Sequence, residues 1–297
     1  MKAFTFTTLL SCLLGVFPIT SCKRNDSRAT ASPVLRFSAI PDQNNTELQE
    51  KFGALAKYLS SKLGVAVEYR PASDYKASVE MFKNGEITLA WFGALTSIQA
   101  KHAVPGSKSI AQGDTDPKFI SYFIAHKDTG LQLASEFPQT IGNLTFTFGS
   151  ESSTSGRLMP EYYIRKNTGK SPAEFFRTAP AFSGSHDQTI ELVESGRIQT
   201  GAVNFEVYEE RVREHKTDPA VCRVIWKTPP FADYSFTAHP KLETLFGAGF
   251  TDRLQSALIA IEDEKLLAVF PRHRLIPVTP GEYDAVEEVA QQLGFVR

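Results

Sequence analysis

Short runs of β-branched and aromatic residues alternate with amphipathic patterns along most of the chain. The run over 34–40 (VLRFSAI) predicts a strand, and Pro41 ends it. Apolar residues then recur at spacings of three and four over 46–63, which predicts an amphipathic helix with Thr46 as its N-cap. The same pattern predicts a strand over 65–70, a helix over 74–84 and a strand over 87–92.

The pattern repeats in the rest of the chain, so we expect two α/β units. Strands separated by helices of this length indicate parallel βαβ units, and ligands of such sheets bind beyond the carboxyl ends of the strands. Two such units that face each other form a clamshell, although one continuous doubly wound sheet would give the same periodicity. The remaining strands are expected over 120–126, 145–149, 178–182, 201–204 and 224–226, and helices over 157–168, 187–194, 251–262 and 282–293.

The N-terminus has the pattern of an export signal. Lys2 supplies a positive charge, and an apolar run over 9–19 follows it. This run is too short to span a membrane, which takes about 20 apolar residues, and is typical of a signal peptide. The sequence Ile-Thr-Ser before Cys22 resembles a bacterial lipobox, so we expect a signal peptide over 1–21, lipidation of Cys22 and a flexible tether over 22–33. An ordinary secretory signal with a chance cysteine is the alternative.

Composition limits the function classes. The chain has 297 residues, is 42% hydrophobic and has a formal net charge of -1, so the basic excess of nucleic-acid-binding proteins is missing. A near-neutral balance still permits a local anion site, which needs only a few donors. Cys222 is the one cysteine after Cys22, so we expect no internal disulfide. The six histidines form no H-x-x-x-H pair, and we expect neither a metal nor a cofactor.

Two segments resemble anion-binding loops, because each leads from a strand into a helix through small polar residues. The first segment is 148–160 (FGSESSTSGRLMP), and the second is 182–189 (FSGSHDQT). Free amides and the positive end of the dipole at a helix N-terminus attract anions. The added donors are the hydroxyls of Ser153, Thr154 and Ser155 and the imidazole of His186. Taken alone, Ser or Thr before a helix is usually a cap, and His186 can be a cap or surface histidine.

The combination of these motifs resembles one protein family. In order along the chain, the segments SAIPDQN, ASDYKA, LAWFG, SSTSG, SGSHD and GAVN are similar to the substrate-binding proteins of phosphonate and phosphite importers. The resemblance covers about residues 34–295. The segments LAWFG and TPPFADY (228–234) are most similar to a branch labelled selenate or phosphonate binding.

The resemblance implies an α/β fold of two lobes, a type II-like periplasmic-binding-protein clamshell with a hinge and a central ligand cleft. Lobe I would comprise 34–118 and about 237–297, and lobe II 119–236, with hinge crossings near 118–122 and 228–236. Aminophosphonate binders carry a tyrosine where this chain has Ser97, which implies a smaller ligand. The residues that the resemblance assigns to the oxyanion are Tyr75, Ser153, Thr154, Ser155, His186 and Asn204.

The implied function is capture of a small tetrahedral oxyanion or phosphonate for an ABC permease and its ATPase, by a monomeric, non-enzymatic lipoprotein in the periplasm or at the cell surface. Phosphonate, phosphite, phosphate and selenate all stay open as ligands. A protonated ligand would need an acceptor carboxylate, for which Asp187 and Glu206 are candidates. A lipoprotein that senses an anion predicts the same cleft. A Ser/His hydrolase is disfavoured, because adjacent His186 and Asp187 do not readily orient as a base and its partner.

Overall fold

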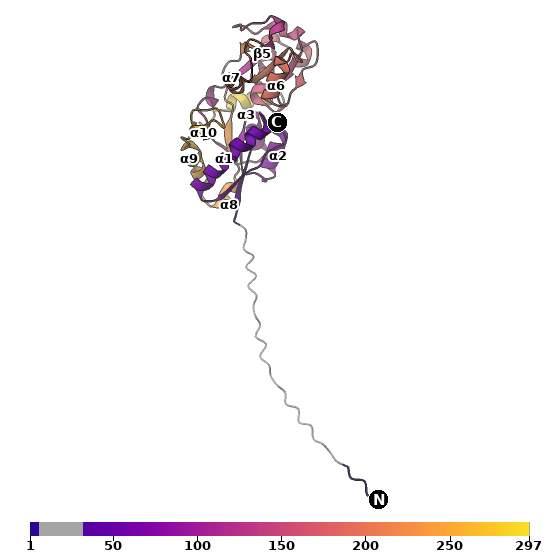
Figure 1. Cartoon of the computed structure of the whole chain (residues 1–297), viewed down its shortest axis with the longest axis vertical. Coiled ribbons are helices and arrows are strands. Elements are labelled where there is room, and N and C mark those ends of the chain that lie inside the picture. Colours follow the sequence, from indigo (N-terminus) through magenta and orange to yellow (C-terminus); the bar gives the residue numbers. More distant parts are fainter. Residues whose placement is uncertain (6–31, 297) are drawn as a thin grey trace. The chain divides into compact units, whose positions relative to one another are not determined.

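The first sheet lies in the lower half of the folded part in Figure 1 and contains six strands in the order β11-β4-β10-β3-β1-β2. The computed structural model describes residues 1–5 and 32–296, so the expected signal peptide, most of the tether and Cys22 lie outside the described residues. Strands β2, β1 and β3 are parallel, whereas β10 and β11 run antiparallel to their neighbours. The strands are β1 (Val34–Ala39), β2 (Ala66–Tyr69), β3 (Leu89–Phe92), β4 (Lys108–Gly113), β10 (Ser235–Ala238) and β11 (Leu275–Pro277).

Seven helices accompany this sheet, and we call the sheet and these helices lobe I. The side chain of Asn44 caps α1 by accepting from the backbone N–H of Thr46 at 2.9 Å, so the prediction that Thr46 is the N-cap is wrong. Asp74 caps α2 in the same way through the N–H of Ala77. The helices are α1 (Asn45–Leu63), α2 (Tyr75–Lys83), α3 (Ala94–Ala103), α8 (Lys241–Phe246), α9 (Phe250–Ile259), α10 (Glu264–Leu267) and α11 (Asp284–Gln292).

The second sheet has five strands in the order β7-β6-β8-β5-β9, and with its helices it forms lobe II, at the upper end in Figure 1. Its strands are β5 (Ser121–His126), β6 (Phe146–Phe148), β7 (Ala181–Phe182), β8 (Thr200–Asn204) and β9 (Cys222–Lys227). Its helices are α4 (Met159–Thr168), α5 (Pro172–Phe175), α6 (His186–Glu194) and α7 (Phe205–Arg213), with short turns η2 (Lys127–Thr129), η3 (Gln139–Asn143) and η4 (Thr154–Leu158).

The two sheets share one plan, which corrects the expectation of purely parallel units. In each sheet one antiparallel strand is inserted beside the third strand of a parallel set, β10 in lobe I and β5 in lobe II. Each inserted strand directly follows a segment that crosses between the lobes. Two separate sheets also exclude the single continuous sheet that the sequence left open.

Two segments, 114–120 and 228–234, connect the sheets, and the first contains the short turn η1 (Asp116–Lys118). They pair with each other: the N–H of Phe119 donates to the carbonyl of Phe231 at 2.8 Å, and the N–H of Phe231 returns a bond of 2.9 Å. The buried carboxylate of Asp116 binds Arg272 of lobe I. The exact lobe boundaries given above stay a prediction.

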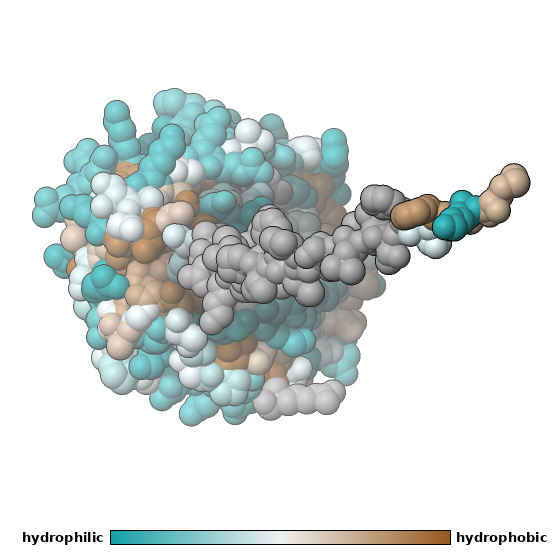
Figure 2. Space-filling model, turned by 90° about the horizontal axis from the view of Figure 1, so that it is seen from below, coloured by the Kyte–Doolittle hydropathy of each residue, from teal (hydrophilic) through white to brown (hydrophobic). Residues whose placement is uncertain are grey.

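Each lobe has an aromatic interior. Phe37, Phe52 and Phe82 are fully buried in lobe I, as are Phe123 and Phe146 in lobe II. The core and the strands all lie within 33–296, so this part has the buried apolar area that a stable fold needs. On the face seen in Figure 2, hydrophilic residues predominate and hydrophobic ones form smaller areas between them. Across the described residues, no helix has the length and apolar character to cross a membrane.

Candidate functional site

The first predicted anion loop follows β6 and is built as a tight turn. Residues 149–153 lead into η4, a single π-helical turn, and α4 continues from it. The hydroxyl of Ser153 accepts from the N–H of Gly156 at 2.9 Å, and the carbonyl of Ser153 accepts from Leu158 at 3.0 Å. Single π-turns are rare and are frequent at functional sites, so this local geometry fits the predicted role of the loop.

The three hydroxyls of this loop have different surroundings. The Ser153 hydroxyl accepts from the N–H of Gly156 within the loop. The Thr154 hydroxyl accepts from the backbone N–H of Leu95 of lobe I at 3.0 Å. The Ser155 hydroxyl is buried and has no hydrogen-bond partner among the described residues. Of the three, Ser155 therefore has the hydroxyl that is free to donate to a ligand.

The second predicted loop brings His186 to the same place. His186 is the first residue of α6 and is fully buried, and its Nδ1 accepts from the N–H of Asn204 at 3.3 Å. Burial lowers the pKa of His186 to about 3, so the ring is neutral and Nε2 carries the proton. Nε2 is buried without a partner anywhere in residues 32–296. The geometry thus leaves one neutral imidazole donor unused.

Tyr75 reaches the site from lobe I, where it begins α2. Its ring is 1% exposed, and within the part of the chain that the structure describes its hydroxyl has no partner. Burial raises the pKa of Tyr75 well above its ordinary value, and the nearby carboxyl of Asp42 adds to this rise. The hydroxyl therefore keeps its proton and is a third unused donor.

A buried carboxyl completes the group, and the sequence prediction missed it. Asp233 lies in the second crossing segment and is 1% exposed. Its Oδ1 accepts from the N–H of Ala94 at 2.9 Å, whereas Oδ2 has no partner among the residues described. Burial raises the pKa of Asp233 to about 7, and the N–H of Ala94, which donates to the carboxylate, counteracts this rise in part.

The elements that carry Tyr75, Ser155, His186 and Asp233 meet at one place. Asp233 and Thr154, the neighbour of Ser155, bond to successive amides at the start of α3, and the ion pair of Lys76 with Glu151 brings the start of α2 beside the same loop. A Cβ on Gly156 would lie 3.0 Å from Cε1 of His186, so the loop passes directly beside the imidazole. Buried polar groups without partners are rare in folded proteins, and four together indicate a site for a polar ligand.

The side chain of Asn204 has hydrogen-bond partners within the protein. Its side-chain oxygen caps α7 by accepting from Glu206 and Val207, and its amide donates to the hydroxyl of Tyr234 at 3.0 Å. That hydroxyl donates to Oδ2 of Asp42 at 2.9 Å. Because Asn204 belongs to lobe II and Asp42 to lobe I, this chain of bonds joins the lobes beside the site. A direct contact of Asn204 with the ligand stays a prediction.

Asp187 and Glu206, the carboxylates considered from the sequence, have partners of their own. The carboxylate of Asp187 accepts from the hydroxyl of Ser185. Glu206 accepts from Thr115 at 3.0 Å and lies 3.8 Å from Arg272. Asp233, by contrast, has a buried carboxylate oxygen without a hydrogen-bond partner among the described residues.

Ser97 points away from the unpaired group, toward the sheet of lobe I. Its hydroxyl bonds to Thr237 of β10 at 2.8 Å and to Ser109 of β4 at 3.1 Å. The position at which aminophosphonate binders carry a tyrosine thus supplies no aromatic wall in this chain.

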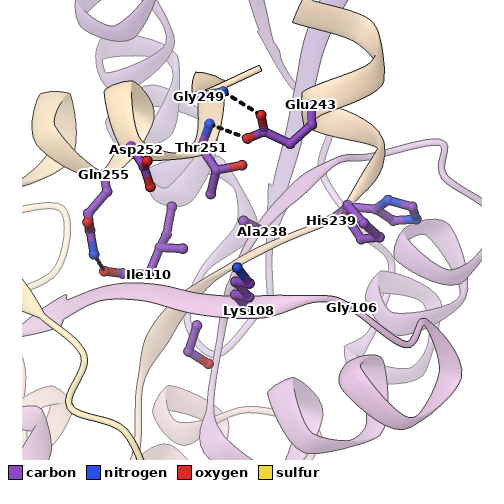
Figure 3. Close-up of a pocket in the computed structure, with 12 residues that line it drawn as sticks. Gly106, Lys108, Ile110, Ala238, His239, Glu243, Gly249, Thr251, Asp252 and Gln255 are labelled. Carbon is purple, nitrogen blue, oxygen red and sulfur yellow. Dashed lines mark hydrogen bonds between the residues drawn. The ribbon is translucent and has the colours of Figure 1, made fainter. Parts of the chain in front are cut away.

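A separate cavity of about 470 Å³ lies in lobe I between β4, β10, α8 and α9 (Figure 3). Its polar groups are largely used: Glu243 accepts from the N–H groups of Gly249 and Thr251, and Gln255 donates to the carbonyl of Ile110 (Figure 3). None of the predicted site residues lines it. In residues 1–5 and 32–296, no group of His, Cys, Asp and Glu side chains is arranged to hold a metal ion.

Comparison with known proteins shows the family to which the chain belongs. A family described as "ABC transporter, phosphonate, periplasmic substrate-binding protein" matches residues 37–283. The chain belongs to the phosphonate-binding family. The phosphonate-binding match spans both sheets and includes Tyr75, the two loops and Asp233.

Relatives within the phosphonate-binding family cover most of the chain. PhnD1 of Prochlorococcus marinus, named as an ABC transporter phosphite binding protein, is 38% identical over 89% of this chain and 91% of its own length. A structure of PhnD1 in complex with methylphosphonate has a TM-score of 0.84 and covers 89% of this chain and 99% of that chain. A phosphate-import protein, PhnD of Mycolicibacterium smegmatis, is 27% identical over 88% of this chain and 86% of its own length.

A more distant structure shows the same fold. The binding protein component of an ABC phosphonate transporter from Pseudomonas aeruginosa is 21% identical, has a TM-score of 0.75 and covers 87% of this chain and 85% of that chain. The two-lobed periplasmic-binding-protein fold predicted from the sequence is therefore confirmed. At the level of the phosphonate-binding family, the chain is a periplasmic substrate-binding protein of an ABC transporter and not an enzyme.

Proposed function

We propose that this protein captures phosphite or a small alkylphosphonate such as methylphosphonate and delivers it to an ABC permease. The observation that carries the proposal is the grouping of three unused neutral donors with one carboxyl in a buried site. The donors are Tyr75, Ser155 and His186, and the carboxyl is Asp233. The names of the relatives, one a phosphite binding protein with a methylphosphonate complex, support the same ligand class.

The electrostatics of the group favour an anion that shares a proton. The three donors bring no formal charge, and the helix N-termini of α6 and of the η4–α4 segment offset the negative charge of the ligand. Phosphite and phosphonates keep a proton near neutral pH, so one proton can lie between the ligand and Asp233. Sulfate and selenate carry no proton at neutral pH and would meet the carboxylate with repulsion. We therefore place phosphite and phosphonates ahead of selenate.

The number of contacts fits useful affinity. Hydrogen bonds to a charged group contribute about 1.5–3 kcal/mol each. Micromolar binding requires about 8 kcal/mol net. Four such contacts supply this free energy after the entropy cost of ordering the ligand and the loops is subtracted. The ligand is small, because Ser97 leaves the site without the aromatic wall that accompanies an aminoalkyl group.

The test is a calorimetric titration of protein lacking residues 1–22 with phosphite, methylphosphonate, phosphate, 2-aminoethylphosphonate, sulfate and selenate. We expect phosphite or methylphosphonate to bind with a Kd below about 10 µM, and sulfate and selenate to bind at least about 100-fold more weakly. Tighter binding of sulfate or selenate would contradict the proton argument. Folded protein that binds none of the six anions would contradict the function.

We also propose that Cys22 carries a lipid that holds the protein at the membrane. The apolar run over 9–19 and the lipobox-like residues before Cys22 support this assignment. In cells fed a labelled fatty acid, we expect the wild-type protein to be labelled and to fractionate with membranes. The Cys22→Ala variant should be unlabelled and released, and labelling of that variant would reject Cys22 as the site. Cys222→Ala is the matched control, because Cys222 is buried within β9.

A further inference from the structure

Helix α3 of lobe I begins without a cap of its own. Gly93 holds the N-cap position, and no side chain there accepts from the first amides of the helix. Such amides normally bond to a Ser, Thr, Asp or Asn side chain at the N-cap. Here the N–H of Ala94 donates to Asp233 of the crossing segment at 2.9 Å, and the N–H of Leu95 donates to Thr154 of lobe II at 3.0 Å.

The backbone at Gly93 does not require glycine. Its φ of -70° and ψ of 163° are in the extended region that any residue adopts. The missing side chain matters for another reason: a Cβ would lie 3.0 Å from the hydroxyl of Thr154 and 3.1 Å from Oδ1 of Asp233. Both distances are to the atoms that cap α3. Glycine at this position therefore leaves room for the groups that replace its own cap.

We propose that Thr154 caps helix α3 in trans and that Gly93 keeps the space open for it, so that the cap forms only when the lobes are closed. The inference rests on the proposed function, because it takes the lobes to close around a ligand. Thr154 is 2% exposed and comes from the loop that also carries Ser155, so the ligand loop and the cap move as one unit. When the lobes open, water replaces Thr154 at the N–H of Leu95.

This arrangement couples ligand affinity to a contact that does not touch the ligand. A ligand that binds the closed state shifts the equilibrium by its differential affinity, and every contact specific to the closed state adds to the observed affinity. Thr154 therefore positions lobe II against α3. Gly93 allows the two lobes to approach closely, because it has no side chain at their contact. Neither effect needs a contact between Gly93 and the bound anion.

The test compares Gly93→Ala with Gly53→Ala, both in protein lacking residues 1–22. Gly53 lies inside α1, and a Cβ there would meet nothing within 4 Å, so it is a matched control. We expect Gly93→Ala to remain folded and to bind methylphosphonate at least about tenfold more weakly, with its decrease in radius of gyration shifted to correspondingly higher ligand concentrations. Wild type and Gly53→Ala should bind alike and become more compact.

A second measurement separates the cap from a ligand contact of Thr154. Hydrogen exchange of the Leu95 amide should slow strongly when methylphosphonate saturates the wild type and Thr154→Ser. It should slow much less in saturated Thr154→Val, which has lost the accepting hydroxyl. If the Leu95 amide were protected equally in Thr154→Val, or if Gly93→Ala bound and became compact like the wild type, the proposed cap would be wrong. Wild-type protein that binds neither methylphosphonate nor phosphite would overturn the proposed function and the cap with it.

Discussion

Replacing Asp233 by asparagine is expected to weaken methylphosphonate binding by about 100-fold and to improve sulfate binding, so that the order of preference reverses. Asparagine can still accept from the N–H of Ala94 through its oxygen, so the local backbone contact is kept. Its amide group replaces the free Oδ2 and can only donate. A ligand proton then has no acceptor, whereas a fully deprotonated anion gains a donor.

The pH dependence of sulfate binding gives the same prediction a second readout. Burial raises the pKa of Asp233 to about 7 in the ligand-free protein. Below that pH the carboxyl is protonated and can donate to sulfate, and above it the carboxylate repels sulfate. The affinity of the wild type for sulfate should therefore fall as the pH rises through about 7, and that of Asp233→Asn should fall less.

Calorimetric titrations of wild type, Asp233→Asn and Asp187→Asn with methylphosphonate and sulfate, each at pH 6 and pH 8, check both statements. Asp187→Asn is the control, because the carboxylate of Asp187 already accepts from Ser185. Its affinities should remain within about threefold of the wild type. A loss of methylphosphonate binding in Asp187→Asn with normal binding in Asp233→Asn would move the acceptor to Asp187.

Replacing His186 by alanine is expected to weaken methylphosphonate binding by at least about 100-fold. The substitution removes the unused Nε2 donor and also the Nδ1 acceptor of the Asn204 N–H. The site therefore loses a hydrogen bond to the ligand and a hydrogen bond that holds α6 beside β8. Because the pKa of His186 is lowered to about 3, the imidazole does not titrate between pH 5 and pH 8. Any pH dependence of binding in that range should therefore survive in the residual affinity of the variant.

The measurement is the same titration, with a thermal melt to confirm that the variant folds. His126→Ala is a suitable control, since His126 ends β5 and its side chain lies beside Asp128. Near-normal affinity in His186→Ala would remove His186 from the site.

The sequence predicted the lobes more reliably than the details of their sheets. Long amphipathic helices such as α1 and short apolar strands such as β1 carry their own periodicity, so they were found within a few residues. The antiparallel strands β10 and β11 were missed. Strand β10 has four residues, all buried, and strand β11 has only three, so neither is long enough to show a distinctive period.

The site was predictable where motif and geometry coincide. Tyr75, Ser155 and His186 stand at the starts of helices, where small polar residues after a strand are a visible signal. Asp233 gave no such signal, because it stands among apolar residues of a crossing segment and only the fold shows that it is buried beside the loops. Thr154 was expected to hold the ligand, and its bond to Leu95 depends on a contact between residues 59 positions apart.

The paired crossings have a consequence for engineering. The mutual bonds of Phe119 and Phe231 join the two connections into a short ribbon, so the two connections move together when the lobes move. Asp233 lies two residues beyond Phe231 on this ribbon. A change made there to alter which anion is accepted will also alter the mechanics of opening, so selectivity and release rate cannot be tuned independently at this position.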